Sequence, residues 1–572
     1  MKYFVKDVGE VDLNQKDFVA SGGFGKVYKQ KTIAYKIYED VKNMLPVGKI
    51  QELSVLKDQD IIKPEHLIFD KNKKELVGYT MKFVKGFPIC EIFTNTFKKK
   101  NNISNKMCLN ILDKLYSKVE HIHQNKILIV DCNELNFLIS NDYLNVFAID
   151  TDGYQTPSYK ATGIMDNIRD RHCINNAFTE ETDWFSWGIL AAQVLLGIHV
   201  YRGGNSDFDK VDAADRMNLR MLKNVSIFNK KSRLPGMCPP IDSVIPSGLR
   251  QWMIEVYENG KRIKPPKDFN GLIVIANSNI QKIKGTNLFD INLLKSFNEE
   301  IYDYYSNDGD NYVLFKNKIL FNNKNYGLPS SNCLISYCAA INGPISFNIE
   351  NDKLNCFDII NQRNIQVDFS CFNLFKVDSR TYCTQNNHLI ELSVEKIGKN
   401  LFCKTNVVGN VLDASNATKC FDGGLIQNML GRHYFSILPK SGQCYQISIK
   451  ELDGFKVINA KFEKNVLMIY AINLKGIKYR FLIKLSSDYS NYSCSTKDNV
   501  QSTEINFCVN DSGICVIIND EEKVELFSSS MNSTSVKILD DPNINGSMNL
   551  VSDGSKILFY SDKDLYSFSL KK

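Results

Sequence analysis

The spacing of apolar residues changes along the 572-residue chain and predicts two kinds of structure. Near the start, Phe18–Lys29 predicts a strand, a glycine turn and a strand, and Thr32–Tyr38 predicts a third strand. Val47–Leu56 has apolar positions at helical spacing, and Leu76–Phe83 again predicts a strand. Strands mixed with helices at these intervals indicate an α+β domain over about the first 270 residues.

The longest apolar run, Trp184–Tyr201, is interrupted by Ser186, Gln193 and His199. A membrane span needs about 20 apolar residues with few polar interruptions. We therefore expect a buried core helix here.

After residue 306 the helical spacing fades, and short alternating runs recur between turns rich in Asn, Asp, Gly and Lys. Gly513 and Gly554 occupy the same position in two such units and are 41 residues apart. That period is typical of a four-stranded propeller blade, so residues 306–572 are expected to form an all-β propeller of six or seven blades. Between the two parts, Leu272–Ile283 and Phe289–Ile301 have helical spacing, which predicts a helical linker over residues 271–305.

Three polar residues stand out among apolar neighbours between His121 and Tyr154: Asp131, Asn136 and Asp150. Two short predicted strands separate Asn136 from Asp150, and a hairpin of this kind brings both residues to one end of the strand pair. Their oxygen atoms suit a hard cation such as Mg²⁺. Asp131 lies on the same loop and is placed to orient a hydroxyl, which is the arrangement that phosphoryl transfer needs.

A glycine-rich turn with Gly22, Gly23 and Gly25 lies between the first two predicted strands. Glycine lets backbone N–H groups approach a phosphate closely, although a plain β-turn has the same composition. Lys36 follows on the third strand, and Glu52 follows in the predicted helix. A Lys–Glu pair between strand and helix would hold the lysine toward phosphates.

Composition sets broad limits on these expectations. The net charge of +6 is spread over the chain without a basic stripe, which argues against nucleic-acid binding. The 16 cysteines form no C-x-x-C pair, so reduced thiols in a cytoplasmic protein are expected rather than zinc ligands. The first residues lack the apolar run of a signal peptide, and we expect no membrane association.

Residues 1–270 resemble a eukaryotic-type protein kinase domain, with an N-lobe over about 1–85 and a C-lobe over about 86–270. The resemblance implies that Asp131, Lys36 and Asn136 are catalytic and that Asn136 and Asp150 hold Mg²⁺ or Mn²⁺. It also implies a brace of the catalytic loop by Asp183 and closure of the C-lobe by Lys261–Pro266. The residues that it assigns to ATP are Gly22, Gly23, Gly25, Val27, Ala34, Lys36, Glu52, Met81, Lys82, Phe83 and Val84.

Some positions depart from the usual kinase pattern. Val130 stands where an arginine is usual, Asn133 replaces a lysine, and the Asp-Phe-Gly motif is Asp150-Thr151-Asp152. Asp152 is either a second carboxylate near the metal or the cap of a turn. This pattern resembles a divergent branch of bacterial and phage kinases, some of which lie beside a phosphatase and a von Willebrand A-type protein.

The resemblance therefore implies an ATP-dependent protein kinase of the serine/threonine type, whose WD40-like propeller recruits or senses a protein partner. The alternatives are a pseudokinase scaffold that uses only the propeller and a structural, virion-associated component. Retention of Lys36, Asp131, Asn136 and Asp150 favours the kinase, whereas Val130, Asn133 and Asp152 favour the scaffold.

Overall fold

A seven-stranded antiparallel sheet forms the N-terminal part of the computed structural model, which describes residues 1–21, 25–161, 163–267, 288–307, 310–412, 417–533 and 535–571. The strand order is β2-β1-β6-β7-β5-β4-β3, and the short helix α1 (Val47–Leu53) follows β5 in the chain. The strands are β1 (Lys2–Val5), β2 (Gly9–Asp12), β3 (Phe18–Ser21), β4 (Gly25–Gln30), β5 (Ile33–Tyr38), β6 (Leu67–Asp70) and β7 (Leu76–Lys82). The three predicted strands around the glycine turn are thereby confirmed.

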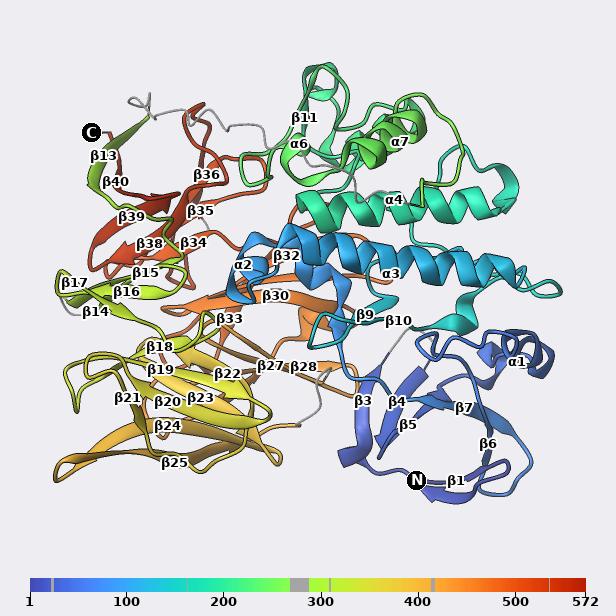
Figure 1. Cartoon of the computed structure of the whole chain (residues 1–572), viewed down its shortest axis with the longest axis horizontal. Helices are drawn as coiled ribbons and strands as arrows, with labels where there is room; N and C mark the ends of the chain where they lie inside the picture. Colours follow the sequence, from blue (N-terminus) through green and yellow to red (C-terminus); the bar gives the residue numbers. More distant parts are fainter. Residues whose placement is uncertain are drawn as a thin grey trace.

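Two long helices, α3 (Asn105–Gln124) and α4 (Glu180–Leu196), run side by side through the helical part (Figure 1). A capping box of Thr179 and Thr182 begins α4, and Gly197 with φ 77° ends it. Every residue of α4 from Asp183 onward is buried, so the predicted core helix is confirmed. The other elements are α2 (Asn95–Lys100), α5 (Ala213–Leu222), α6 (Ile241–Val244), α7 (Ser247–Tyr257), β8 (Phe87–Pro88), β9 (Phe137–Ile139), β10 (Val146–Ala148), β11 (Gly204–Asn205) and β12 (Ser232–Arg233).

Residues 288–571 form seven four-stranded antiparallel sheets in the described part of the chain, and we call this the seven-sheet region. Each sheet except one is a consecutive meander. The first four meanders are β14 (Asp303–Asn307), β15 (Asp310–Leu314), β16 (Lys318–Phe321), β17 (Lys324–Gly327); β18 (Leu334–Cys338), β19 (Gly343–Glu350), β20 (Lys353–Asp358), β21 (Arg363–Ile365); β22 (Phe372–Val377), β23 (Arg380–Gln385), β24 (His388–Ile397), β25 (Asn400–Asn410); and β26 (Thr418–Phe421), β27 (Gly424–Met429), β28 (Arg432–Ile437), β29 (Tyr445–Ser448). The next two are β30 (Lys456–Glu463), β31 (Val466–Ile472), β32 (Lys478–Leu485), β33 (Tyr492–Lys497); and β34 (Phe507–Val509), β35 (Ile514–Ile518), β36 (Val524–Ser528), β37 (Val536–Leu539).

The remaining sheet joins the two ends of this region. Its strands are β38 (Asn549–Asp553), β39 (Lys556–Ser561), β40 (Asp564–Leu570) and β13 (Phe289–Ser296), in the order β13-β40-β39-β38. Phe289 pairs with Leu570 at one end of the register, and Ser296 pairs with Asp564 at the other. First strands of several neighbouring sheets contact one another, including β14 with β38, β22 with β26 and β34 with β38.

The pairing of β13 corrects the prediction for the linker. Phe289–Ile301 was expected to be helical, but it contains strand β13, and the boundary expected at residue 306 falls inside β14. The local apolar spacing fits either structure, and the distant partner β40 decides for the strand. The other predicted linker helix, Leu272–Ile283, lies outside the described residues.

The seven-sheet region packs against both lobes of the N-terminal part. Ile458 and Ile472, from β30 and β31, belong to the same buried cluster as the apolar residues of α3 and α4. Leu412 and Ala417 pack with Tyr28 and Tyr35 on the outer face of the N-terminal sheet. Both contacts bury apolar surface, so the two parts stabilise each other.

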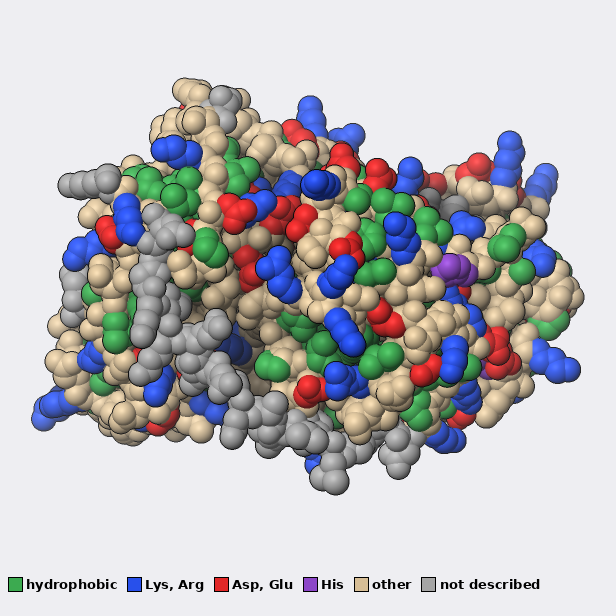
Figure 2. All heavy atoms as spheres, turned by 90° about the horizontal axis from the view of Figure 1, so that it is seen from above, with side chains coloured by type: hydrophobic (Ala, Val, Ile, Leu, Met, Phe, Trp, Pro, Cys, Tyr) green, Lys and Arg blue, Asp and Glu red, His purple; other side chains and the backbone are tan. Residues whose placement is uncertain are grey.

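The outer surface is mixed in charge where Figure 2 shows it. Basic and acidic side chains are interspersed there with small apolar groups. Among the described residues, no helix is long and apolar enough to cross a membrane. All 16 cysteines are free thiols.

Candidate active site

The β9–β10 hairpin brings together the residues that the sequence singled out. Val146 pairs with Ile139 and Ala148 with Phe137, which leaves Asn136 and Asp150 beyond the same end of the hairpin. The N–H of Ile149 donates to the carbonyl oxygen of Asn136 (2.9 Å), so the two chains are adjacent there. The predicted hairpin geometry is thus present.

Asp131 lies beside this hairpin and is linked to it. The side-chain Nδ2 of Asn136 donates to the backbone oxygen of Asp131 (2.9 Å), which leaves the Asn136 Oδ1 atom available to a cation. The Asp131 carboxylate accepts from the backbone N–H of Met165 (2.9 Å) and from Nδ2 of Asn133 (2.8 Å). Burial raises the pKa of Asp131 above its ordinary value, which makes the carboxylate a stronger base when it is ionised.

Asp183 fixes the loop that carries Asp131. Its carboxylate, at the first turn of α4, accepts from the backbone N–H groups of Ile129 and Val130 (2.8 Å each) and lies 2.8 Å from Nε2 of His123. Val130 is buried with φ 64°, a left-handed backbone that is strained for a β-branched residue. These bonds hold the strained backbone in place, as the brace expected of Asp183 requires.

One face of the N-terminal sheet lies on the side of the loop that carries Asp131. The register pairs Val27 with Lys36 and Ala34 with Met81, and alternation along strands therefore places these side chains on one face. Gly25 lies on the same face opposite Tyr38, where an added Cβ would come within 2.3 Å of the Ile37 oxygen. Gly22 and Gly23 lie outside the described residues.

The predicted hinge follows strand β7. Met81 and Lys82 end that strand, and the N–H of Phe83 donates to the Thr32 oxygen (2.8 Å). The Phe83 N–H is therefore engaged within the N-terminal sheet.

Lys36 contacts the segment after the hairpin. Its Nζ lies 2.9 Å from Oδ1 of Asp150 and 2.8 Å from Oδ2 of Asp152. Burial alone would lower the pKa of Lys36, but the two carboxylates outweigh it and hold the pKa well above its ordinary value. Lys36 is therefore a fixed cation.

The expected Lys36–Glu52 pair is wrong. The buried residues of α1 are Lys49, Ile50 and Leu53, so Lys49 faces inward and its Nζ donates to the backbone oxygen of Asp152 (2.6 Å). Glu52 lies on another side of this short helix, and its carboxylate accepts from the N–H of Ser158 (3.2 Å). The orientation of α1 decides this, because only one side of a helix can face the cleft.

The residues present fit a hydrated divalent cation and a nucleotide. The Asp150 side chain is 57% exposed, which leaves it open to solvent, and oxygen ligands suit Mg²⁺. No cluster of three or more His, Cys, Asp or Glu residues suited to a metal is found among the described residues. A cation at Asp150 and Asn136 would therefore need phosphate oxygens and water as further ligands.

The seven-sheet region reaches the loop of Asp131 directly. Glu134, two residues before Asn136, is fully buried, and Lys478 of β32 lies 3.1 Å from its Oε1 atom. The β31–β32 turn lies against the segment that covers Asp131, since a Cβ on Gly476 would meet Asn167 at 2.4 Å and Met165 at 3.0 Å. The segment that covers Asp131 therefore contacts the seven-sheet region directly.

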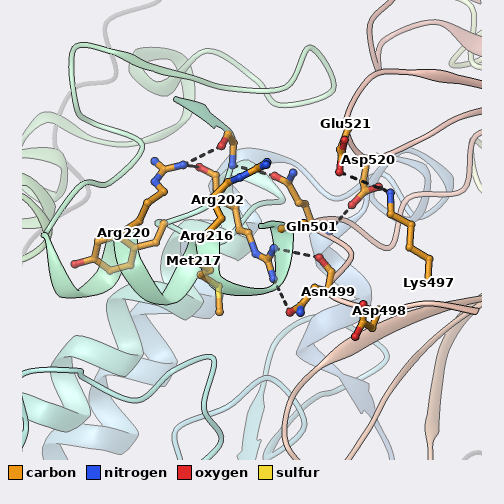
Figure 3. A pocket seen from close by; sticks show the side chains of 13 residues that line it. Arg202, Arg216, Met217, Arg220, Lys497, Asp498, Asn499, Gln501, Asp520 and Glu521 are labelled. Atoms are coloured by element: carbon orange, nitrogen blue, oxygen red, sulfur yellow. Dashed lines mark hydrogen bonds and ion pairs between the residues drawn. The ribbon is translucent and has the colours of Figure 1, made fainter. Parts of the chain in front are cut away.

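A cavity lies between the helical part and the seven-sheet region (Figure 3). Arg202 donates to the backbone oxygen of Asn499 (3.1 Å), and Lys497 pairs with Asp520 (3.1 Å). Arg220 donates to the carbonyl oxygens of Arg202 and Gly203 (2.9 and 2.8 Å). These groups satisfy one another, and the lining residues lie outside the Asp131–Asp150 loop, so the cavity belongs to the contact between the two parts.

Comparison with known proteins gives a limited result. No protein-family model and no curated protein matches the sequence. The chain is similar to the structure of the Cydia pomonella granulovirus kinase PK-1, at 13% sequence identity and a TM-score of 0.32. That match covers 43% of this chain and 87% of that one.

Three contacts at the site were not expected from the sequence: Lys49 with Asp152, Lys478 with Glu134, and Arg262 with Asp170. The last is a double hydrogen bond (2.5 and 2.7 Å) that ties the predicted closing signature to the segment before α4. Lys49 carried a usable signal, because it precedes Leu53 by four positions and residues at that spacing lie on one side of a helix. Lys478 and Asp170 carried none, since their partners are distant in sequence.

Proposed function

We propose that residues 1–267 form an ATP-dependent protein kinase domain that transfers the γ-phosphoryl group to a protein serine or threonine. The observation that supports this most strongly is the placement of Lys36 against Asp150, at the end of the hairpin that also holds Asn136 and Asp131. Oxygen ligands for a cation, a lysine for the phosphates and a base, brought together at one place, are the parts that phosphoryl transfer requires.

Each residue has a separate task in this proposal. Asp150 and Asn136 Oδ1 hold Mg²⁺ or Mn²⁺, which neutralises the phosphate charge when it is bound. Lys36 binds the α- and β-phosphates, and Gly25, Val27, Ala34, Met81 and the backbone of Lys82–Val84 surround the base and phosphates. Asp131 orients the acceptor hydroxyl and takes its proton, which requires the Met165 N–H to move away from the carboxylate.

We also propose that the seven sheets are the blades of a β-propeller. The pairing of β13 with β40 supports this, because it completes the last sheet with the first strand and so joins the ends of the ring. The propeller recruits or senses a protein partner through surface that the kinase part leaves uncovered. A phosphatase or a von Willebrand A-type protein is the partner that the sequence resemblance suggests.

Transfer of labelled phosphate tests the kinase proposal. The purified full chain is incubated with [γ-³²P]ATP and Mg²⁺, with and without generic protein substrates, beside Asp131→Ala and Asp150→Ala. We expect incorporation by the wild type and a loss of about 100-fold or more in both variants, the range for removal of a catalytic acid or base. Incorporation that is equal in the variants would come from another kinase and would contradict the proposal.

A second function, a pseudokinase scaffold, is favoured by one observation. Both oxygens of Asp131 already accept hydrogen bonds from Met165 and Asn133, so the base is engaged by its own chain. Nucleotide binding without any phosphate incorporation, in the presence or absence of partners, would favour the scaffold.

A further inference from the structure

Asp152 is the most enclosed charged group beside the proposed nucleotide site. It is 7% exposed, and its Oδ2 atom accepts from Lys36 Nζ (2.8 Å) and from the hydroxyl of Tyr38 (2.6 Å). Both donors lie on β5, 114 or more residues away in the chain. Such burial of a carboxylate is stable only with close partners of this kind.

The surroundings of Asp152 do not suit a metal ligand. Its Oδ2 atom already accepts from two donors. Mg²⁺ keeps several water molecules, and a carboxylate that is 7% exposed has little contact with solvent. Asp150, two residues earlier, has a side chain that is 57% exposed, so the two carboxylates face different environments.

The backbone of Asp152 is anchored as well. The Nζ of Lys49, which is 2% exposed on α1, donates to the Asp152 oxygen (2.6 Å). Lys49 of α1 therefore holds the backbone of Asp152, and the Asp152 carboxylate holds Lys36 of β5. Strand β5, helix α1 and the segment after the hairpin are joined at one residue.

We infer that Asp152 is the positioning residue for Lys36, in the place where the sequence predicted Glu52. This inference rests on the proposed function and assigns the buried carboxylate to lysine positioning, not to the cation. The Asp152 carboxylate holds the Lys36 ammonium, and the Asp150 side chain stays exposed. Lys36 can then bind phosphate whether or not a cation is present.

Binding of ADP to the full chain, measured by calorimetry in EDTA and again in Mg²⁺, separates the two roles. In EDTA, Asp152→Asn is expected to weaken ADP binding about tenfold, as Lys36→Met does, because a charge-assisted hydrogen bond is worth at least that factor. A variant that combines Asp152→Asn with Lys36→Met is expected to bind ADP no more weakly than Lys36→Met alone, since Asp152 acts through Lys36. In Asp150→Asn, Mg²⁺ is expected no longer to strengthen the binding of ADP.

Matched variants show whether the effect is specific. Glu52→Gln removes the carboxylate that the sequence assigned and is expected to leave ADP binding in EDTA unchanged. Asp207→Asn, in an exposed ion pair with Lys231, controls for a general loss of negative charge. If Asp152→Asn does not fold, Tyr38→Phe and Lys49→Met loosen the same residue and are expected to weaken binding about threefold each, as single hydrogen bonds do.

Several results would overturn the inference. Asp152→Asn with unchanged binding in EDTA and no gain from Mg²⁺ would make Asp152 a metal ligand. Fully additive losses in the double variant would show that Asp152 acts apart from Lys36. A wild type that binds no ADP under either condition would overturn the proposed function itself, and Lys36→Met would then have no effect to compare.

Discussion

The two parts of the molecule bury their charges differently. In the seven-sheet region, Arg480 forms two hydrogen bonds with Glu525 (3.0 and 2.8 Å), and these residues lie 45 positions apart, on β32 and β36 of neighbouring sheets. In the N-terminal part, Lys36 pairs with Asp152 over 116 positions and across two lobes. Repeated sheets thus pair charges at about one repeat, whereas the candidate site collects charges from distant segments.

The hydrophobic cores differ in the same way. One large cluster joins α1, α3, α4 and α7, whereas the seven-sheet region has several smaller clusters between neighbouring sheets. A repeat of small cores stabilises neighbours and leaves each sheet similar to the next. A single large core can hold irregular loops, such as that of Asp131, in one conformation, and we therefore expect chemistry there.

The largest expected effect concerns the joint between the ends of the seven-sheet region. Phe289 is 1% exposed and stacks on Phe568 (4.6 Å between ring centroids). Phe289→Ala is expected to lower the free energy of unfolding by about 4 kcal/mol in urea denaturation, because it leaves a cavity at β13. Phe372→Ala, at a 38% exposed phenylalanine of β22, is the control and is expected to cost far less. Equal losses of unfolding free energy in the two variants would show that β13 does not join the ends of the seven-sheet region.

A smaller loss is expected at the contact between the two parts. Lys478→Met leaves the carboxylate of Glu134 buried without its cation and is expected to cost about 3 kcal/mol. Adding Glu134→Leu replaces both charges by apolar groups and is expected to restore most of the loss. Unfolding in urea for the two single variants and the double variant gives the coupling directly. A double variant less stable than Lys478→Met would contradict the ion pair.

A pH effect is expected from His199 in the helical part. His199 is buried: Nε2 lies 2.8 Å from the Asn167 oxygen, and Nδ1 accepts from the Tyr201 N–H (3.1 Å). Burial, with a further contribution from Arg202, lowers the pKa of His199 from 6.5 to about 3. Between these values the unfolded chain binds the proton and the folded chain does not, so stability falls as the pH falls below 6.5.

The size of that effect follows from the shift. From pH 6.5 to about pH 5, the loss is expected to be about 2 kcal/mol, at 1.36 kcal/mol per pH unit. Urea denaturation at both pH values measures it, and His199→Gln is expected to remove most of this dependence. The same acid loss in His199→Gln and wild type would assign it to other groups.

The smallest effect is expected for Glu52, which the sequence placed at the site and the structure does not. Glu52→Gln changes only an exposed hydrogen bond from the Ser158 N–H, so the free energy of unfolding is expected to stay nearly unchanged. Lys49→Met, on the buried side of the same helix, is the contrast, because it removes the bond to the Asp152 oxygen. Equal effects for the two would show that the side of α1 does not matter.

Local patterns determined a large part of this structure. Alternation and turns predicted the strands around the glycine turn, the β9–β10 hairpin and the repeated sheets near the end of the chain. The polarity of Asp131, Asn136 and Asp150 among apolar neighbours marked the candidate site. These features depend on neighbours within a few residues, and so they can be found from the sequence.

Only the tertiary structure decided which distant groups meet. Phe289–Ser296 is a strand because β40 is its partner. Local spacing is nearly equal for the helix and the strand there. The free energy that selects between them comes from pairing and burial between segments far apart in the chain.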